Sequence, residues 1–426
     1  MTPAVALSGK RPTALIVGPP WPRSGTARVI QNQIDFYRAR GYSPVFICVP
    51  VHCSYTESYS EWDEIEAGMQ ELNADQIFFA RIDDRSFRTA KYVDWVRHGF
   101  RGTALDWIVM SAKSAKLSEI AARALRENSI AVMNVNHVFT FEFALRLLRQ
   151  LTSSSGQQVP VILDTHDVQA HLLEERREVN PWTHRVDKVE RLLMSELSLL
   201  KKAGVLVHCS VDDFNFFKRL LPLKSHVLAL PTINESFVES VHSGGCCSND
   251  AIDLLFVGQY NDPNCAAMKW LFGEVWPLIA DRKYRIKIVG RVDMLVRKNL
   301  PEIYERFRSN FVGPVEELAP YYRATRCVFA PMISGTGVSI KTIEALALGK
   351  PFVGTSRAYR GMPTERLAQA GLQAFDTPQD FADALARALS DEKTFAAASR
   401  TAYTTIFSRE AAFASRDAAL RNLCLA

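Results

Sequence analysis

The chain has 426 residues, 47% hydrophobic and 23% charged, a composition typical of a globular protein with two or three domains. The formal charge of +5 is small for this length and argues against a nucleic-acid partner. No stretch approaches the roughly 20 apolar residues of a membrane span, and the apolar run 14–18 is too short for a secretory signal. We therefore expect a cytoplasmic protein whose membrane contact, if any, is peripheral.

The eight cysteines show neither CxxC pairs nor the spacing of a disulfide framework. We expect reduced, largely buried thiols, as in cytosolic proteins. Cys48, His52 and Cys53 come nearest to a metal-binding cluster, but no second pair of ligands accompanies them. The cysteines therefore give no support to a metal site.

The chain opens with a strand (13–17), a helix (28–40) and a second strand (44–50). Gly18 and Gly25 free the backbone of the first loop, although the pattern is no GxGxxG. Because βαβ crossovers are right-handed and join parallel strands, the opening predicts a parallel sheet.

Residues 51–80 are acidic and contain a short strand at 77–80, whereas residues 81–126 are rich in Arg and Lys interleaved with aromatic residues. One interpretation of this basic stretch is a surface for an anionic partner, either phospholipid headgroups or a polyprenyl-phosphate acceptor. The alternative is a solvated helical face, since acidic residues are mixed in. We interpret Asp83 and Asp84 as a helix start or turn rather than as metal ligands.

Polar residues follow two buried strands. Residues 130–135 end at Asn136 and His137, and residues 159–163 run into Asp164-Thr165-His166-Asp167. Parallel α/β sheets place their chemistry at the carboxyl ends of strands, so this tetrad is a candidate site. A charged helical region (174–202) and a strand (204–208) come next.

The weakly periodic, Pro/Gly/Ser-rich segment 231–250 is the best domain boundary in the sequence. We expect an N-terminal domain at 1–234, a C-terminal domain at 235–408, and a final segment, 409–426, that packs back on the first domain. The second half repeats the α/β pattern, with strands at 253–257, 285–289, 311–313 and 372–375 and a last helix at 408–423.

The most informative stretch is 327–355, which predicts a strand, a glycine loop, a helix and a strand. Lys341 lies in the first helical turn, where a cation opposes the helix dipole by roughly 0.3–1 kcal/mol. A glycine loop running into a helix N-terminus is a ready anion site, and a bound phosphate would make Lys341 a partner. The alternative is a solvated lysine that tolerates the dipole.

Together these features predict two Rossmann-like domains that face each other across a cleft. GTGVSIKTIEALALGKPFVGT, beginning at Gly335, resembles the donor-binding segment of the retaining GT-B glycosyltransferases of family 4. LLFVGQYNDPN (254–264), VILDTHD (161–167) and VLVHCSVDD (205–213) resemble other segments of that family. The pattern around Lys341 resembles a subgroup from bacterial surface-polysaccharide pathways.

The resemblance implies roles for individual residues. Glu344 would accept hydrogen bonds from ribose hydroxyls, and His166 would lie beneath the reacting sugar. Lys341 would counter the charge of the donor diphosphate, and residues 311–314, including Val312, would form the wall against the base. The remaining implied substrate-binding residues are Gly25, Thr26, Gly258, Gln259, Arg291, Gly335, Thr336, Gly337, Val338 and Ser339.

Two positions depart from the family pattern. Thr336 replaces the family's first glutamate, which bears on sugar recognition or on activity itself, and Gln259 replaces a basic residue that would face phosphate. Lys341, Arg291 or both could supply the missing charge.

The resemblance also implies a mechanism and partners. A nucleotide-sugar, UDP- or GDP-linked, would be the co-substrate, with no cofactor and no metal, and a glycan or lipid-linked molecule the acceptor. The acceptor would attack on the face that the diphosphate leaves, with amides, a helix N-terminus and Lys341 stabilising the leaving group.

Other classes fit less well. A Walker A loop needs glycine directly before the lysine, and Ile340 stands there; it also stands where GxGxxG, counted from Gly335, needs its third glycine. A sugar-nucleotide epimerase of the same fold and a non-catalytic glycosyltransferase-like partner subunit remain alternatives.

Overall fold

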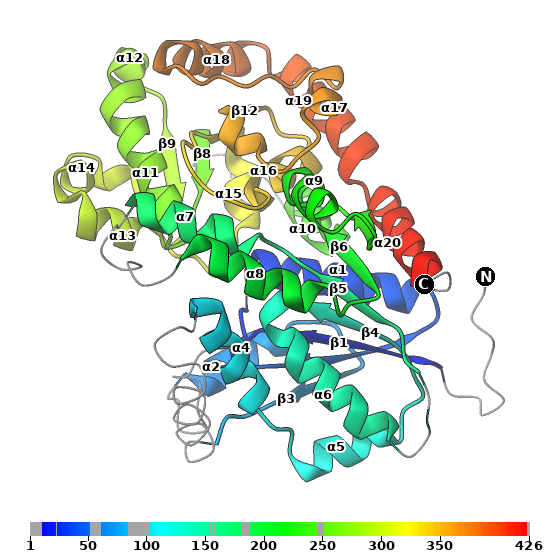
Figure 1. The fold of residues 1–426 in the computed structure, drawn as a ribbon. Helices are drawn as coiled ribbons and strands as arrows, with labels where there is room; N and C mark the ends of the chain where they lie inside the picture. Colours follow the sequence, from blue (N-terminus) through cyan, green and yellow to red (C-terminus); the bar gives the residue numbers. More distant parts are fainter. Residues whose placement is uncertain are drawn as a thin grey trace. The chain divides into compact units, whose positions relative to one another are not determined.

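The chain folds into two compact α/β units, seen in the ribbon view of Figure 1. The computed structural model describes residues 11–423 apart from 23, 52–60, 84–102, 154–155, 157, 180–187 and 245–250. Unit 1 comprises Met1–Ala229 and Phe413–Ala426, and unit 2 comprises Leu230–Ala412. Residues 84–102 of the basic stretch, Asp84 among them, and the cluster partners His52 and Cys53 lie outside the described residues.

Unit 1 is built on a seven-stranded sheet in the order β3-β2-β1-β4-β5-β6-β7, with every pair parallel. In this doubly wound order the direction of winding reverses between β1 and β4, where α/β sheets bind their ligands. The strands are β1 (Thr13–Gly18), β2 (Ser43–Cys48), β3 (Gln76–Phe79), β4 (Ile130–Asn136), β5 (Val161–Asp164), β6 (Val205–His208) and β7 (Ser225–Leu228).

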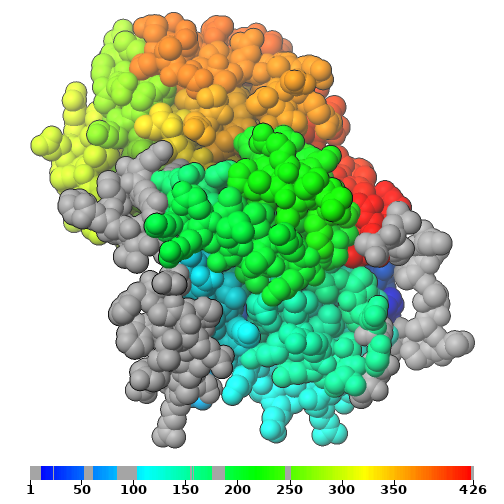
Figure 2. Space-filling model, viewed as in Figure 1, coloured from blue at the N-terminus to red at the C-terminus, as the bar shows by residue number. Residues whose placement is uncertain are grey.

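Helices cover both faces of this sheet, so β1 is buried on both sides and reads as a continuous apolar run. Leu15 and Val17 pack in a core with α4, α6 and α8, whereas Ala14 and Ile16 pack in another with α1, α2 and α20. In the space-filling view α7, α8 and α9 lie on the surface of unit 1 (Figure 2). The helices are α1 (Gly25–Ala39), α2 (Trp62–Gln70), α4 (Ala104–Ser114), α5 (Glu119–Arg126), α6 (Phe141–Thr152), α7 (Gln169–Val179), α8 (Val189–Leu200), α9 (Val211–Leu220) and α20 (Arg409–Leu423).

A buried ion pair fastens α20 to the sheet of unit 1. Arg416 on α20 donates from Nη2 to Asp164 Oδ1 at 2.8 Å, and both side chains are almost fully buried. Asn134 donates to the other oxygen of Asp164 at 2.7 Å, and Tyr37 donates to Asn134 at 3.0 Å. The last helix thus supplies the counter-charge of a carboxylate at the end of β5.

Unit 2 has a five-stranded parallel sheet in the order β10-β9-β8-β11-β12. The reversal falls between β8 and β11, and one continuous apolar core fills the unit. The strands are β8 (Ile252–Val257), β9 (Ile286–Val289), β10 (Phe311–Gly313), β11 (Thr325–Ala330) and β12 (Phe352–Gly354). The helices are α10 (Glu235–Ser243), α11 (Asp262–Trp270), α12 (Trp276–Ile279), α13 (Val292–Asn299), α14 (Pro301–Arg306), α15 (Ala319–Ala324), α16 (Ile340–Ala347), α17 (Thr364–Gln369), α18 (Pro378–Ser390) and α19 (Glu392–Ala402).

The predicted α/β fold with two parallel sheets and a final helix is confirmed, but two strand predictions were wrong. Residues 372–375 form no strand; Ala374 makes an isolated bridge to Gly354. Conversely, β7 was not predicted, because the half-exposed Ser225 and His226 interrupt the apolar run that marks the other buried strands. Among the described helices none is long and apolar enough to cross a membrane.

We predict that Arg416→Ala lowers the free energy of unfolding by about 3–5 kcal/mol, because it leaves the buried Asp164 carboxylate without its counter-ion. Chemical denaturation followed by circular dichroism measures the change. Asp417→Asn is the matched control: it removes the partly exposed Asp417–Arg40 pair on the same helix and should cost less than about 1 kcal/mol. Equal losses in the two variants would contradict a special role for the buried pair.

Candidate functional site

The switch point of unit 2 gathers most of the predicted site residues. β8 ends at Val257 and is followed by Gly258 and Gln259, while β11 is followed by the glycine loop and α16. Because β8 and β11 are neighbours, Gly258 and the glycine loop leave the sheet at the same edge, on either side of the reversal.

The ends of β8, β9 and β10 are tied together through glycines. Gly258 donates to Val289 O at 2.9 Å, and Gly290 donates to Gly313 O at 2.8 Å. Gly290 has φ +107°, and a Cβ there would lie 2.3 Å from the Gly258 carbonyl oxygen. No other residue type fits this position, so the two loops can approach each other with backbone groups at the sheet edge.

Lys341 lies in the first turn of α16, as predicted, and its ammonium is poorly compensated. Nζ donates to Asn264 Oδ1 at 2.5 Å, contacts Met332 Sδ at 3.7 Å and lies 4.2 Å from the centre of the buried Phe256 ring. Within the described part of the chain it forms no ion pair with a carboxylate. Burial, and then repulsion by Arg360, hold the pKa of Lys341 well below its usual value, against a smaller opposite effect of Glu344.

Asn264 connects this ammonium to the loop after β8. Its side-chain nitrogen donates to Gln259 O at 2.9 Å, while its oxygen accepts from Lys341. Gln259 itself is exposed. Asn264 was not predicted to lie in the site, because its contact with Lys341 joins residues 77 positions apart.

A second cation, Arg360, lies at the glycine loop and was also missed. Its Nε donates to Thr336 O at 2.9 Å, and its guanidinium lies about 3.2 Å from where a Cβ on Gly335 would be. Gly335 has φ +119°, so a side chain there would be strained as well as crowded. Arg360 thus packs against the loop and fixes the backbone of Thr336, the position where the resemblance implies a glutamate.

Glu344 is buried, and its Oε2 accepts a hydrogen bond from the Tyr322 hydroxyl at 2.9 Å. Tyr322 is fully buried too, so this bond fixes the orientation of the carboxylate. One oxygen of Glu344 is therefore engaged by the protein itself, a constraint on the ribose contact that the resemblance implies.

The other predicted residues of unit 2 lie around the same edge. Ser339 precedes α16 and is buried, with its hydroxyl 3.0 Å from that of Thr342 rather than capping the helix. Arg291 is exposed at the start of α13, and Val312 lies in the middle of β10. Gly337 and Val338 are partly exposed in the glycine loop.

In unit 1, the predicted residues Thr26 and His166 are linked through His137. Thr26 Oγ1 lies 3.0 Å from His137 Nε2, and the His137 ring stacks on that of His166 with centroids 3.9 Å apart. Gly25 begins α1, whose first turn is capped by the Ser24 hydroxyl accepting from Ala27 N. The three segments meet at the carboxyl ends of β1, β4 and β5, beside the switch point.

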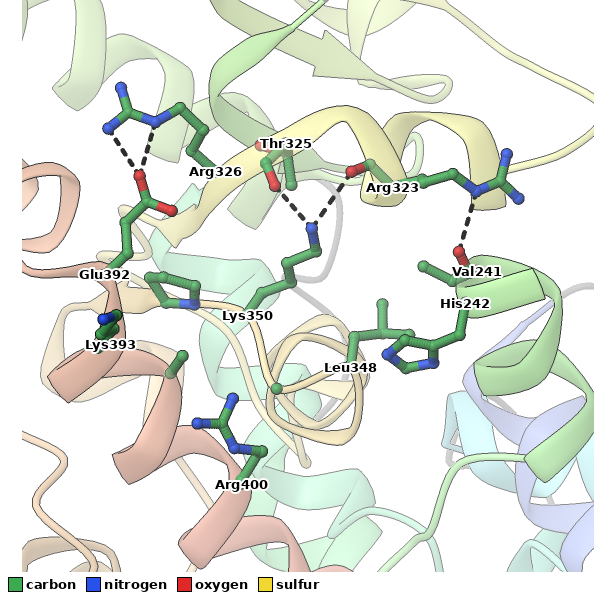
Figure 3. Close-up of a pocket in the computed structure, with 13 residues that line it drawn as sticks. Val241, His242, Arg323, Thr325, Arg326, Leu348, Lys350, Glu392, Lys393 and Arg400 are labelled. Atoms are coloured by element: carbon green, nitrogen blue, oxygen red, sulfur yellow. Dashed lines mark hydrogen bonds and ion pairs between the residues drawn. The ribbon is translucent and has the colours of Figure 1, made fainter. Parts of the chain in front are cut away.

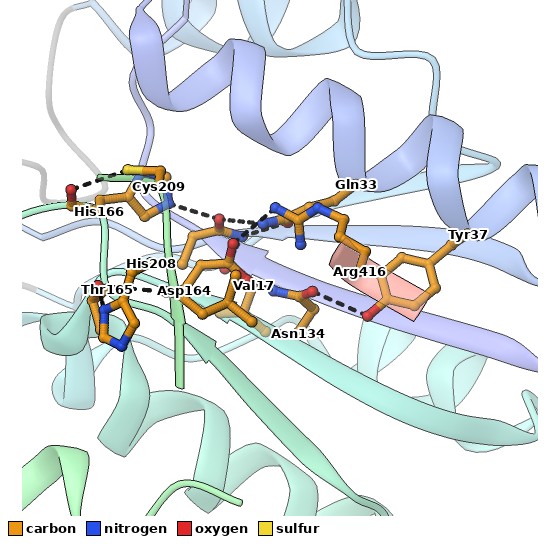
Figure 4. A network of polar contacts seen from close by, with 12 residues as sticks. Val17, Gln33, Tyr37, Asn134, Asp164, Thr165, His166, His208, Cys209 and Arg416 are labelled. Carbon is orange, nitrogen blue, oxygen red and sulfur yellow. Dashed lines mark hydrogen bonds and ion pairs between the residues drawn. The ribbon is translucent and has the colours of Figure 1, made fainter. Parts of the chain in front are cut away.

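Both histidines have left-handed backbones, with φ 65° for His137 and 61° for His166. Such geometry costs a non-glycine residue about 1–3 kcal/mol and occurs preferentially at functional sites. His166 Nε2 lies 2.8 Å from Asn136 Oδ1, whereas His137 Nδ1 is buried and has no hydrogen-bond partner among the described residues. Figure 4 shows these polar contacts: the bond from His166 to Asn136 continues to Gln33, and Asp164 bonds separately to Asn134 and Arg416.

The histidines of this region are held neutral. Burial lowers the pKa of His166 to about 4 and that of His208 to about 3, and it takes the pKa of His137 well below the usual value. In each case burial is the largest cause, because a low-dielectric surrounding disfavours the imidazolium. At neutral pH these rings can donate or accept hydrogen bonds but carry no charge.

Two buried carboxyl groups of unit 1 have pKa values that burial raises. Burial raises the pKa of Glu196 to about 8 and that of Asp213 to about 8. Glu196 accepts from the backbone N–H of Gln169 at the start of α7, and each group has one buried oxygen without a described partner. No set of three described His, Cys, Asp or Glu residues could hold a metal ion.

Comparison with known proteins now adds to this geometry. Residues 251–391, about a third of the chain, match the family model of Glycosyl transferases group 1. The matched segment contains the whole switch point of unit 2, from Gly258 to Glu344. No curated protein has a significant sequence match to the chain.

Several solved structures share the fold. Sucrose-phosphate synthase from Thermosynechococcus elongatus superposes with a TM-score of 0.63 at 15% identity, covering 97% of this chain and 100% of that one. A UDP-forming α,α-trehalose-phosphate synthase from Burkholderia vietnamiensis gives 0.60 at 13% identity, covering 97% and 100%. HepE from Anabaena in complex with UDP gives 0.56 at 12% identity, covering 96% and 99%. The fold is that of the GT-B glycosyltransferases.

We predict that the pH dependence of stability changes in Glu196→Gln. The folded-state pKa of Glu196 lies above the unfolded value, so the wild-type protein loses stability as pH rises from about 4.5 to 8, by up to about 1.4 kcal/mol per pH unit. Glutamine keeps an acceptor for the α7 amide and removes the titration. Denaturation at pH 5.5, 6.5 and 8 should show that the variant gains stability relative to wild type with rising pH. The exposed Glu190→Gln on the same helix is the control, and parallel profiles of the wild type and Glu196→Gln would refute the assignment.

Proposed function

We propose that the protein is a glycosyltransferase that moves a sugar from a nucleotide-diphosphate sugar to a glycan or lipid-linked acceptor with retention of anomeric configuration. One observation carries the proposal: the Lys341 ammonium lies at the switch point of a Rossmann-like sheet, in contact with an amide, a thioether and a ring, and forms no ion pair with a carboxylate of the described residues. A bound anion would stabilise a cation in this position. Because the segment matches a glycosyltransferase family, we propose that this anion is the diphosphate of a nucleotide sugar.

The donor diphosphate would bind the N-terminus of α16 and the amides of Gly337, Val338 and Ser339, with Lys341 and Arg360 as counter-charges. Gly258, Gln259 and Arg291 would border the same site, Val312 would face the base, and Glu344 would accept a hydrogen bond from a ribose hydroxyl. As the bond from the anomeric carbon to the diphosphate breaks, these groups stabilise the negative charge that develops on the leaving oxygen.

Unit 1 would receive the sugar and the acceptor. His166, neutral at pH 7, could exchange hydrogen bonds with a sugar hydroxyl, and the contact of Thr26 with His137 orders the loop before α1. In retaining transfer the acceptor hydroxyl attacks from the face that the diphosphate leaves, so no carboxylate nucleophile is required. We propose metal-independent transfer in the cytoplasm, with a lipid-linked acceptor bringing the enzyme to the membrane surface.

A non-catalytic partner subunit is the second candidate, and one observation favours it. Thr336 stands where the family has a sugar-binding glutamate, and its carbonyl is taken by Arg360. Such a subunit could retain nucleotide binding without turnover. An epimerase would convert the donor sugar without any acceptor, so product analysis distinguishes all three.

The first test is nucleotide binding by calorimetry, with UDP before GDP because two of the structures of similar fold are described with UDP. Lys341→Ala should weaken binding at least tenfold and lower kcat/KM by about 10²–10³, since it removes a charge-assisted contact to the leaving group. Arg308→Ala, an exposed arginine of unit 2 outside the site, is the control. Equal affinity of wild type and Lys341→Ala for every nucleotide tested would overturn the proposal.

The number of protons taken up when the nucleotide binds provides an independent test. Because the pKa of Lys341 is depressed in the free protein, a bound diphosphate should raise it, and binding above the free-state pKa should take up a proton. Titrations in buffers of different ionisation enthalpy measure this uptake, and affinity should fall by up to about tenfold per pH unit in that range. Absence of proton uptake at every pH from 6 to 9 would contradict it.

Asn264→Asp should separate stability from binding. A carboxylate beside Lys341 supplies the missing counter-charge, so the melting temperature should rise, while the added negative charge should weaken nucleotide binding at least tenfold. Thermal shift and calorimetry on the same sample measure the two effects. The control, Asn299→Asp, changes the same residue type at the end of α13. Tighter nucleotide binding by Asn264→Asp would refute the placement of the phosphates.

A further inference from the structure

Unit 2 contains a cavity of about 460 Å³ away from the switch point, shown in Figure 3. It lies among the ends of α10, α15 and α16, the first residues of β11 and the stretch 392–400 of α19. Because Thr325 begins β11 and the glycine loop follows its last residue, the cavity is at the opposite end of this strand from Lys341. Six residues of strand separate the two by about 17 Å, too far for one diphosphate to span.

The lining of this cavity is strongly basic. Five cationic side chains face one carboxylate, which leaves an excess of four positive charges. Asp253, which pairs with Arg326 from outside the lining, offsets one of these charges, and the helix C-termini of α10, α15 and α16 each offset about half a charge, so at least one positive charge remains uncompensated. The charged lining residues are Arg323, Arg326, Lys350, Lys393, Arg400 and Glu392.

Three of the cations have structural roles. Arg323 donates to Val241 O at 2.9 Å and Lys350 donates to Thr325 O at 2.7 Å, so both satisfy backbone carbonyls near helix ends. Arg326 pairs with Glu392 and Asp253. These contacts explain why three cations converge here, and they consume the one carboxylate of the lining.

The other two cations, Arg400 and Lys393, are not explained in this way. Both are exposed on α19, and neither side chain forms a hydrogen bond or ion pair with any described residue. Arg400 packs over Gly349, whose missing side chain leaves the space: a Cβ there would lie 2.8 Å from Arg400 Cγ. In Figure 3 the guanidinium of Arg400 is drawn without a dashed line, beside the helix end that Lys350 follows.

We propose that this cavity is a second anion site, which binds a phosphoryl group of a phosphorylated small molecule or of a lipid headgroup. Arg400 and Lys393 bind the phosphoryl oxygens. Lys350 and Arg326 keep their backbone and carboxylate partners and add to the positive electrostatic potential of the cavity. Guanidinium and ammonium groups are the side chains that phosphate prefers, and the volume suits a small organic phosphate. The site is independent of the function proposed above.

The test is a calorimetric titration of the full chain with inorganic pyrophosphate at low ionic strength. The double variant Arg400→Ser/Lys393→Ser should lose at least tenfold in affinity for this cavity, because two charge-assisted contacts disappear. The control, Arg308→Ser/Lys298→Ser, removes the same charge from exposed positions of unit 2 and should change the affinity less than twofold. Lys341→Ala, titrated in parallel, reports on the donor site alone, so failure of either site is visible separately.

Cosedimentation with phosphatidylglycerol vesicles, and with phosphatidylcholine vesicles as the neutral reference, distinguishes the source of the phosphate. Loss of vesicle binding in the cavity variant but not in the control identifies a lipid headgroup, whereas loss of pyrophosphate binding alone identifies a soluble phosphate. If the double variant unfolds, Lys393→Ser replaces it, since that side chain is exposed and unpaired within the described structure. Identical pyrophosphate and vesicle binding by the wild type, cavity variant and control overturns the proposal.

Discussion

The constraint on which unit 2 depends is an ammonium group that folding removes from water and that forms no ion pair with a carboxylate of the described residues. Lys341 is held by one amide oxygen, one sulfur and one aromatic face, and Arg360 repels it. Such an arrangement lowers the free energy of unfolding of the ligand-free protein, and a bound anion raises it again. The glycines at 258, 290 and 335 keep the surrounding backbone close, so that its amide groups can reach the same anion.

Unit 1 follows a different principle, because its site is uncharged. His137 and His166 are neutral, stacked and strained, and the nearest charges, Asp164 and Arg416, neutralise each other. A neutral, rigid edge suits the recognition of hydroxyl groups, whereas the cationic edge of unit 2 suits phosphates. Under the proposed function, unit 1 would recognise sugar hydroxyls and unit 2 would bind the diphosphate.

The sequence predicts the elements better than it predicts their contacts. Lys341 and the strand-end residue His166 follow from local signals: glycines, the start of a periodic helix and the ends of apolar runs. Glu344 was identified only through the family resemblance. Asn264, Tyr322 and Arg360 were missed because each acts on a residue at least 22 positions away, and neither spacing nor composition encodes such a contact. The basic cavity of unit 2 was missed for the same reason, since its cations come from three separate segments.

The ion pair of α20 has a consequence for the order of folding during synthesis. Asp164 emerges from the ribosome some 250 residues before Arg416, and until then its carboxylate has no permanent counter-charge. The sheet of unit 1 is thus made first but completed last, after the whole of unit 2 has been translated. A nascent chain paused before residue 416 should depend on water or on a chaperone to stabilise that sheet.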